Sequence, residues 1–218
     1  MAPSSTVSTL PEPRQFQFKI LVTGDVGVGK TSIVKRYMDG GFSTDYRLTI
    51  GVDFSLKNIE WNESTNVNLQ LWDIAGHERF GNMTAVYYRH ASAAIIVFDP
   101  TRPHTFKSVS RWYEDLISKF SEDGIRWEIP VLLLANKCDL PYAKIDFEEV
   151  HEFCEEHGFV GWFPTSAKEN INIDSAMMYL VEKILKNKLD GCSPESKQSR
   201  INLAEEVEED TVKKKKCC

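Results

Sequence analysis

The chain lacks an excess of basic residues and has no long apolar run. It contains 26 Lys and Arg against 32 Asp and Glu, which gives a formal net charge of −6. A surface that neutralises nucleic-acid phosphates needs clustered Lys and Arg in excess, so this composition argues against nucleic-acid binding. No uninterrupted apolar run approaches the roughly 20 residues of a membrane-spanning helix, so we expect any membrane contact to be peripheral.

Cysteine is sparse and a secretory signal is missing. The five cysteines form an odd, irregularly spaced set. The N-terminal stretch MAPSSTVSTLPEP has neither the basic region nor the long apolar core of a signal peptide. Both absences predict a reducing, cytosolic environment. A chain of 218 residues, 42% hydrophobic and 27% charged, is long enough for one well-buried domain.

Changes in amino-acid composition and patterning divide the chain into three parts. Residues 1–15 are rich in Ser, Thr and Pro and predict a disordered N-terminal extension. Residues 16–188 alternate strand and helix patterns and predict the folded domain. Residues 189–218 contain an acidic run, a run of four lysines and two terminal cysteines with few large apolar groups, which predicts a flexible tail.

Strand and helix patterns alternate through the central part. The alternating stretches GVDFSLKNIEW and NVNLQLWDI, joined by NEST, predict an antiparallel hairpin. Further strands are predicted at FKILVTG, SAAIIVFD, IPVLLLANK and GFVGWFPTSA, and helices at about 78–89, 105–120, 147–157 and 173–188. This alternation predicts an α/β fold, a mostly parallel sheet with helices on both faces.

A glycine-rich loop connects the first strand to the first helix. GDVGVGKT, residues 24–31, fits G-x-x-x-x-G-K-[ST] in the strand–loop–helix context that the motif requires. Glycines let the backbone N–H groups wrap a polyphosphate, Lys30 reaches the outer phosphates and Thr31 offers a hydroxyl to Mg²⁺. The spacing excludes the dinucleotide pattern G-x-G-x-x-G. The predicted phosphate-binding residues are Asp25, Val26, Gly27, Val28, Gly29, Lys30, Thr31 and Ser32.

Two further motifs follow predicted strands. Asn136-Lys137-Cys138-Asp139 and Thr165-Ser166-Ala167-Lys168 both lie at carboxyl ends of strands, where open α/β sheets bind ligands. An Asp carboxylate there accepts two hydrogen bonds from the N1–H and exocyclic amine of guanine, whereas adenine has no such donor pair. Guanine is therefore favoured over adenine.

Taken together, the glycine loop, D-x-A-G, N-K-x-D and S-A-K resemble the small GTPases of the Ras superfamily over residues 16–188. The resemblance implies a P-loop NTPase domain with a six-stranded, mostly parallel sheet containing one antiparallel strand. It also implies GTP/GDP and Mg²⁺ as cofactors, and GTP hydrolysis. The guanine-binding residues it implies are Asn136, Asp139, Lys137, Lys168, Ser166 and Ala167, with Phe42 packed on the base.

The same resemblance places two switch segments around the last phosphate. It implies that Thr49 and Thr31 ligate Mg²⁺, that Asp73 holds the ion through water, and that the Gly76 N–H meets the γ-phosphate. Loss of that phosphate would release both segments. The predicted catalytic residues are Lys30, Gly76 and His77.

His77 departs from the family pattern, which has a glutamine that orients the attacking water. An imidazole lacks the paired donor and acceptor of an amide, which favours slow hydrolysis with nucleotide binding intact. Two alternatives stay open: normal hydrolysis assisted by a partner's catalytic groups, or a general-base role for the imidazole. Val26, β-branched, either crowds groups arriving at the γ-phosphate or points away from them.

The C-terminus resembles that of the Rab branch. Cys217 and Cys218 follow Lys213 to Lys216 and do not form a C-a-a-X box. The resemblance implies geranylgeranylation of both thiols, and two prenyl chains with adjacent lysines give stable membrane anchoring. It implies as partners an exchange factor, an activating protein, a GDP-dissociation inhibitor or escort protein, and effectors. Two idle thiols beside a solubilising charge run are the alternative.

The body of the domain resembles the same branch. Phe54, Trp72 and Tyr87 match aromatic residues that Rab proteins present to effectors, although core packing is a rival role for them. Ile74, FGNMTAVYYR and GFVGWFPTSAKENINIDSAM resemble the subgroup serving lysosome-related organelles and trans-Golgi traffic. The expected location is the cytosolic face of a lysosome-related organelle, endosome or trans-Golgi membrane, with cycling through the cytosol.

The sequence thus predicts a Rab-type, membrane-anchored GTP/GDP switch with slow hydrolysis. The alternative is a constitutively GTP-bound scaffold with negligible turnover. A P-loop phosphotransferase acting on a small molecule would need an acceptor pocket and lid, for which the sequence offers no candidate.

Overall fold

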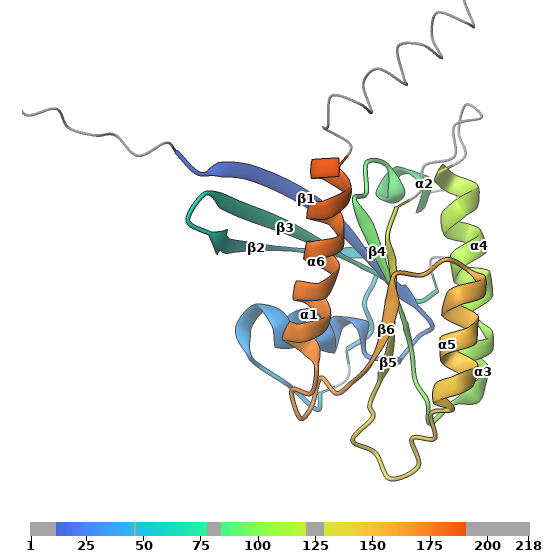
Figure 1. The fold of residues 1–218 in the computed structure, drawn as a ribbon. Coiled ribbons are helices and arrows are strands. Elements are labelled where there is room, and N and C mark those ends of the chain that lie inside the picture. The colour runs from blue at the N-terminus through green and yellow to red at the C-terminus, as the bar shows by residue number, and fades with distance from the viewer. Residues whose placement is uncertain (1–11, 46, 78–83, 121–128, 191–218) are drawn as a thin grey trace, which may run out of the picture.

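The fold is built on one sheet, seen in a computed structural model that describes residues 12–45, 47–77, 84–120 and 129–190. Its six strands lie in the order β2-β3-β1-β4-β5-β6 (Figure 1). The strands are β1 (Arg14–Gly24), β2 (Val52–Asn62), β3 (Thr65–Ile74), β4 (Ala93–Phe98), β5 (Val131–Asn136) and β6 (Gly161–Thr165). The helices are α1 (Lys30–Asp39), α2 (Thr84–Tyr88), α3 (Pro103–Lys107), α4 (Val109–Phe120), α5 (Phe147–Glu156) and α6 (Ile173–Asp190).

Strand directions follow the sequence patterns. β2 pairs with β3 in antiparallel fashion, and the pairs β1–β3, β1–β4, β4–β5 and β5–β6 are parallel. The alternating stretches therefore form the predicted hairpin, and the mostly parallel sheet with one antiparallel strand is confirmed. Every residue of β4 and β5 is buried, as expected for continuous apolar runs at the centre of a parallel sheet.

Helices cover both faces of the sheet (Figure 1). On one face, apolar side chains of α1 and α6 pack with those of β1 and β3 in one buried cluster. On the other face, α4 and α5 pack with β4 and β5 in a second cluster. Because parallel strands all end at the same edge, this arrangement brings the loops after β1, β5 and β6 together there.

Some element boundaries differ from the expected ones. The predicted helix 105–120 is wrong as a single helix: α3 starts at Pro103, where proline suits a first helical turn, and α4 follows after Ser108. The Ser108 N–H and hydroxyl both donate to His104 O, each at 3.1 Å, and Ser108 is the junction between the two helices. β1 begins at Arg14, paired with Thr65, rather than at residue 16.

At the other end, α6 extends to Asp190, past the expected boundary at residue 188. Of the helix expected at 78–89, the described part is α2. Residues 78–83 and the C-terminal tail with Cys217 and Cys218 lie outside the described residues.

Candidate functional site

A cavity of about 370 Å³ lies where the loops after β1, β5 and β6 meet. The predicted residues that line it are Val26, Gly27, Gly29, Lys30, Thr31, Ser32, Phe42, Thr49, Gly76, Asn136, Lys137, Asp139, Ala167 and Lys168. Five other residues predicted for the nucleotide site are described but are not part of this lining: Asp25, Val28, Asp73, His77 and Ser166. The fold thus brings three separate sequence motifs to one cavity.

The glycine loop curves around one end of this cavity. Gly27 and Gly29 have φ values of 75° and 99°, in the left-handed region that favours glycine. α1 starts directly after Gly29, so the positive end of the helix dipole lies at the loop. This is the backbone geometry of an anion site.

Lys30 is a buried cation at the same end. Its Nζ donates to Gly24 O at 2.8 Å and to Asp25 O at 3.0 Å. Burial lowers the pKa of Lys30 to about 8, against the opposing effect of the Asp73 and Asp25 charges. Because the charged form is poorly solvated there, a bound anion would stabilise it.

Two residues of the loop direct their side chains away from the cavity. Asp25 Oδ1 accepts a hydrogen bond from Trp112 Nε1 of α4 at 2.8 Å. Val28 is fully buried in the core under α1 and α6. Only the backbone of Asp25 and Val28 is therefore available to a ligand in the cavity.

Three oxygen-bearing side chains meet beside Lys30. Thr31 Oγ1 and Thr49 Oγ1 lie 2.8 Å apart, and the Thr31 hydroxyl donates to Asp73 Oδ2. Burial raises the pKa of Asp73, although Thr31 and Lys30 act in the opposite direction. Asp73 Oδ1 is buried and has no hydrogen-bond partner among the residues that the structure describes. Hydroxyl and carboxylate oxygens, one of them unsatisfied, fit the ligand preference of Mg²⁺.

The opposite end of the cavity is formed by the loops after β5 and β6. Asn136 Nδ2 donates to Val28 O at 2.8 Å, and Asn136 Oδ1 accepts from Ala167 N at 3.2 Å. Asn136 therefore ties these loops to the glycine loop with both ends of its amide. Ser166 is buried, and its hydroxyl accepts from Glu169 N at 3.0 Å.

Arg36 of α1 holds the loop after β6 by two hydrogen bonds. Its Nε donates to Ala167 O at 2.7 Å and its Nη2 to Lys168 O at 2.8 Å. The Arg36 guanidinium carbon also lies 5.9 Å from the centre of the Phe42 ring, which is partly exposed at the cavity. Asp139, in the loop after β5, also lines the cavity.

Gly76 sits against the glycine loop. A Cβ at this position would lie 2.5 Å from Val26 N and 2.7 Å from Asp25 C, so the contact requires glycine. His77 follows directly and its side chain is exposed, whereas Val26 is partly exposed and lines the cavity. His77, the residue that departs from the family pattern, is therefore the chain neighbour of a glycine that lies against Val26.

The aromatic residues form a contiguous row over β2, β3 and α2. Phe54 and Trp72 have ring centroids 5.5 Å apart, and Trp72 and Tyr87 6.3 Å apart. Phe54 is 46% exposed, whereas Trp72 and Tyr87 also pack against the buried cluster under α4. The row therefore has an exposed ring at one end and partly buried rings at the other.

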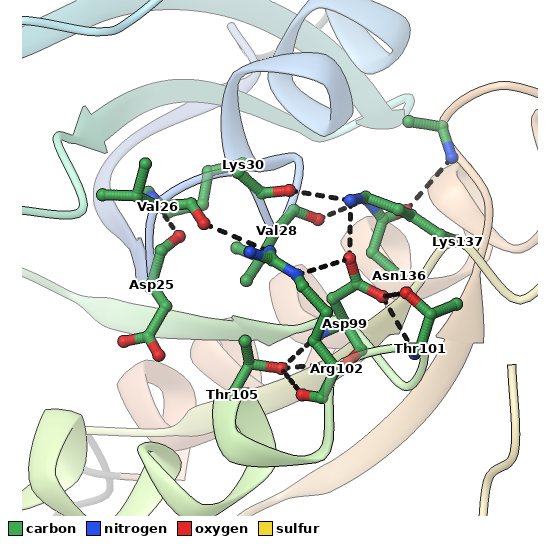
Figure 2. A network of polar contacts seen from close by, with 12 residues as sticks. Asp25, Val26, Val28, Lys30, Asp99, Thr101, Arg102, Thr105, Asn136 and Lys137 are labelled. Carbon is green, nitrogen blue, oxygen red and sulfur yellow. Dashed lines mark hydrogen bonds and ion pairs between the residues drawn. The ribbon is translucent and has the colours of Figure 1, made fainter.

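Several residues that surround the glycine loop belong to none of the predicted motifs. Arg102 donates to Val26 O, and Asp99 accepts from Lys137, which holds Gly27 O (Figure 2). Trp112 Nε1 donates to Asp25 Oδ1. Arg102 is 76 positions from its partner Val26 and Trp112 is 87 from Asp25. No local pattern marks contacts at such separations. Arg36 was missed for the same reason.

The fold and the cavity define a P-loop nucleotide-binding protein. Comparison with known proteins narrows this class. Residues 19–186 match the sequence model of the Ras family. The chain is 50% identical over 215 residues to Ras-related protein Rab-32 of Mus musculus, covering 98% of this chain and 96% of that protein. Ras-related protein Rab-32 of Homo sapiens is 51% identical over 209 residues, covering 95% and 92%.

Ras-related protein Rab-7L1 of Homo sapiens is 50% identical over 174 residues, covering 80% of this chain and 85% of that protein. The chain belongs to the Rab branch of the Ras family. It is a GTPase that binds GTP or GDP with Mg²⁺ and acts in membrane trafficking, and its branch works with exchange factors, activating proteins, GDP-dissociation inhibitors and effectors. Within the described residues, no helix is both long and apolar enough to cross a bilayer.

Proposed function

We propose that the cavity holds the guanine nucleotide with its phosphates in the glycine loop and its base between the loops after β5 and β6. The observation that carries this assignment is the meeting of three oxygen ligands, with one unsatisfied Asp73 oxygen, directly beside Lys30. Mg²⁺ bound by Thr31 and Thr49, with Asp73 through water, would neutralise the phosphates there. Asp139 would accept the two guanine hydrogen bonds.

Slow hydrolysis is the second part of the proposal. Phosphoryl transfer in this class depends on positioning a water and stabilising charge. His77 follows Gly76, whose N–H would meet the γ-phosphate, so its imidazole takes the place of the water-orienting amide. An imidazole offers the water one nitrogen at a time, as donor or acceptor. The switch would therefore reset slowly while nucleotide affinity stays normal.

Single-turnover hydrolysis of GTP tests this reset rate. We expect His77→Gln to hydrolyse about tenfold faster, because a positioned group typically contributes at least that factor. GDP affinity should not change. His151→Gln, which alters an exposed histidine on α5, is the matched control and should hydrolyse at the wild-type rate. Equal rates for the wild type and His77→Gln would defeat the slow-switch proposal.

A scaffold that remains GTP-bound is the second candidate. The position of Val26 favours it, since this β-branched side chain lines the cavity beside the Gly76 contact and can crowd an incoming catalytic group. Chromatography of bound nucleotide over time distinguishes the two. A switch converts its GTP to GDP when an activating protein is added, whereas a scaffold keeps GTP for many hours.

The membrane part of the proposal concerns the tail. We infer that prenyl groups on Cys217 and Cys218, next to Lys213–Lys216, hold the protein at the cytosolic face of a lysosome-related organelle, endosome or trans-Golgi membrane. The Phe54–Trp72–Tyr87 row would then face effectors. A tagged chain in cells should lie on these membranes, and a chain without the two cysteines should be diffuse. Diffuse signal from both would contradict the anchoring.

A further inference from the structure

Three successive carbonyls of the glycine loop are held from outside that loop. The pairs are Arg102 Nη2 to Val26 O at 3.1 Å, Lys137 Nζ to Gly27 O at 2.7 Å and Asn136 Nδ2 to Val28 O at 2.8 Å (Figure 2). Lys137 and Asn136 belong to the predicted base motif. Arg102 belongs to no motif: it precedes α3, in the segment after β4.

Holding a carbonyl fixes the direction of the amide that follows it. A planar trans peptide points its C=O and N–H in opposite directions. When Arg102 holds Val26 O on the outer side, the Gly27 N–H is directed to the inner side of the loop. Gly27 lines the cavity, so this N–H is one of those that a phosphate would meet.

Arg102 is itself held in place by a buried carboxylate. Its Nε lies 3.1 Å from Asp99 Oδ2, and Lys137 Nζ lies 2.6 Å from the same oxygen. Asp99 is only 1% exposed. Burial alone would raise the pKa of Asp99, but hydrogen bonds from Lys137 and Thr101 outweigh it, and the pKa lies below its ordinary value. The carboxylate is therefore ionised and positions two cations on neighbouring carbonyls.

The guanidinium is also close to the phosphate-binding end of the cavity. A Cβ built on Gly27 would lie 3.6 Å from Arg102 Nη2. The charge of Arg102 adds to the effect of burial in lowering the pKa of Lys30. An anion bound at the loop would offset this repulsion between the two cations.

We propose that Arg102 is a positioning residue for the polyphosphate, which clasps the Val26 carbonyl from outside and so presents the Gly27 N–H to the phosphates. This clasp, the hydrogen bond from Arg102 Nη2 to Val26 O, rests on the proposed phosphate site. It extends that site, because Arg102 is not among the residues that line the cavity. Its effect should fall on phosphate binding and not on recognition of the base.

The test is the dissociation rate of a fluorescent GDP analogue from the full chain with Mg²⁺ present. Arg102→Ala should release the analogue about tenfold faster, the lower range for loss of a hydrogen bond to a charged group. Arg102→Lys should lie between Ala and the wild type, because an ammonium keeps the charge but lacks the planar fork whose Nε and Nη2 point separately at Asp99 and Val26 O. Arg111→Ala, an exposed arginine on α4, should match the wild type.

Base recognition is the second measurement, because a general loosening of the protein would weaken it, whereas loss of the clasp would not. Inosine diphosphate lacks the exocyclic amine, so the ratio of GDP to IDP affinity reports the base end alone. This ratio should be the same in Arg102→Ala and the wild type. A ratio that falls with the GDP affinity would overturn the clasp in favour of a general structural role. If Arg102→Ala does not fold, Arg102→Gln, which loses the charge, serves in both measurements.

Lys30→Ala separates failure of the clasp from failure of the phosphate site. Wild-type dissociation from Arg102→Ala together with weak GDP binding by Lys30→Ala would overturn the clasp and leave the site standing. Wild-type GDP binding by Lys30→Ala would overturn the site, and the clasp with it.

Discussion

The two ends of the cavity differ in how firmly the fold holds them. At the base end, Asn136 and Ser166 are fully buried, and Arg36 holds two successive carbonyls of the loop after β6. At the other end, the switch end, Thr49 lies beside Thr31, and residues 47–50 form neither helix nor strand. Leu48 and Ile50 there are 54% and 83% exposed.

This difference assigns different tasks to the two ends. A buried, multiply hydrogen-bonded loop keeps its shape whatever the nucleotide, so it suits recognition of the base, which GTP and GDP share. An exposed segment with few buried contacts opens at low free-energy cost, so contacts with a third phosphate can decide its conformation. We therefore expect the exposed apolar side chains at that end to form a surface that depends on the nucleotide.

The largest effect on GDP affinity is expected for Asp139→Ala, which alters the base end. Each hydrogen bond to the carboxylate contributes about 1.5–3 kcal/mol, so losing two should weaken GDP binding about 100-fold or more. Calorimetry on nucleotide-free protein measures this. Asp146→Ala removes another carboxylate from the same connection, the N-cap of α5, and should leave GDP affinity unchanged. A GDP affinity within threefold (~0.6 kcal/mol) of wild type for Asp139→Ala would refute the base assignment.

A pH titration tests the phosphate end, with a smaller expected effect. Lys30 has a pKa of about 8 in the nucleotide-free protein, and bound phosphates should raise it. Binding then takes up a proton above pH 8, so GDP affinity should fall about tenfold between pH 7 and pH 9. Lys30→Arg, whose guanidinium does not titrate in this range, should show no such fall. Equal pH profiles for the two proteins would contradict the linkage.

The smallest effect on GDP affinity is expected for Arg36→Ala, which tests how firmly the base end is held. Loss of its hydrogen bonds to Ala167 O and Lys168 O should loosen the base end and weaken GDP binding about fivefold, the equivalent of roughly 1 kcal/mol. Displacement of a fluorescent GDP analogue measures this. Ile50→Ser at the switch end is the control and should retain wild-type GDP affinity. Similar losses in both variants would mean that the two ends do not differ.

Motifs whose residues are neighbours in sequence could be predicted well. The glycine loop, the base motifs and the hairpin of β2 and β3 each follow from a local pattern of residue types, and the cavity contains most of the residues they nominate. The break at Ser108 could not be predicted, because helical periodicity continues across it. The outward direction of the Asp25 side chain could not be predicted either, because it depends on Trp112 of α4.

The sequence by itself determined the class of the protein, since glycines, Lys30, Thr31 and Asp139 at fixed spacings are the chemistry that a guanine nucleotide and its Mg²⁺ require. How the loops that bear these residues are held in place follows from tertiary contacts. Asp99, Arg102 and Arg36 reach the cavity loops from distant segments. Which side chain meets which carbonyl depends on how strands and helices pack, and packing joins residues without regard to their separation along the chain.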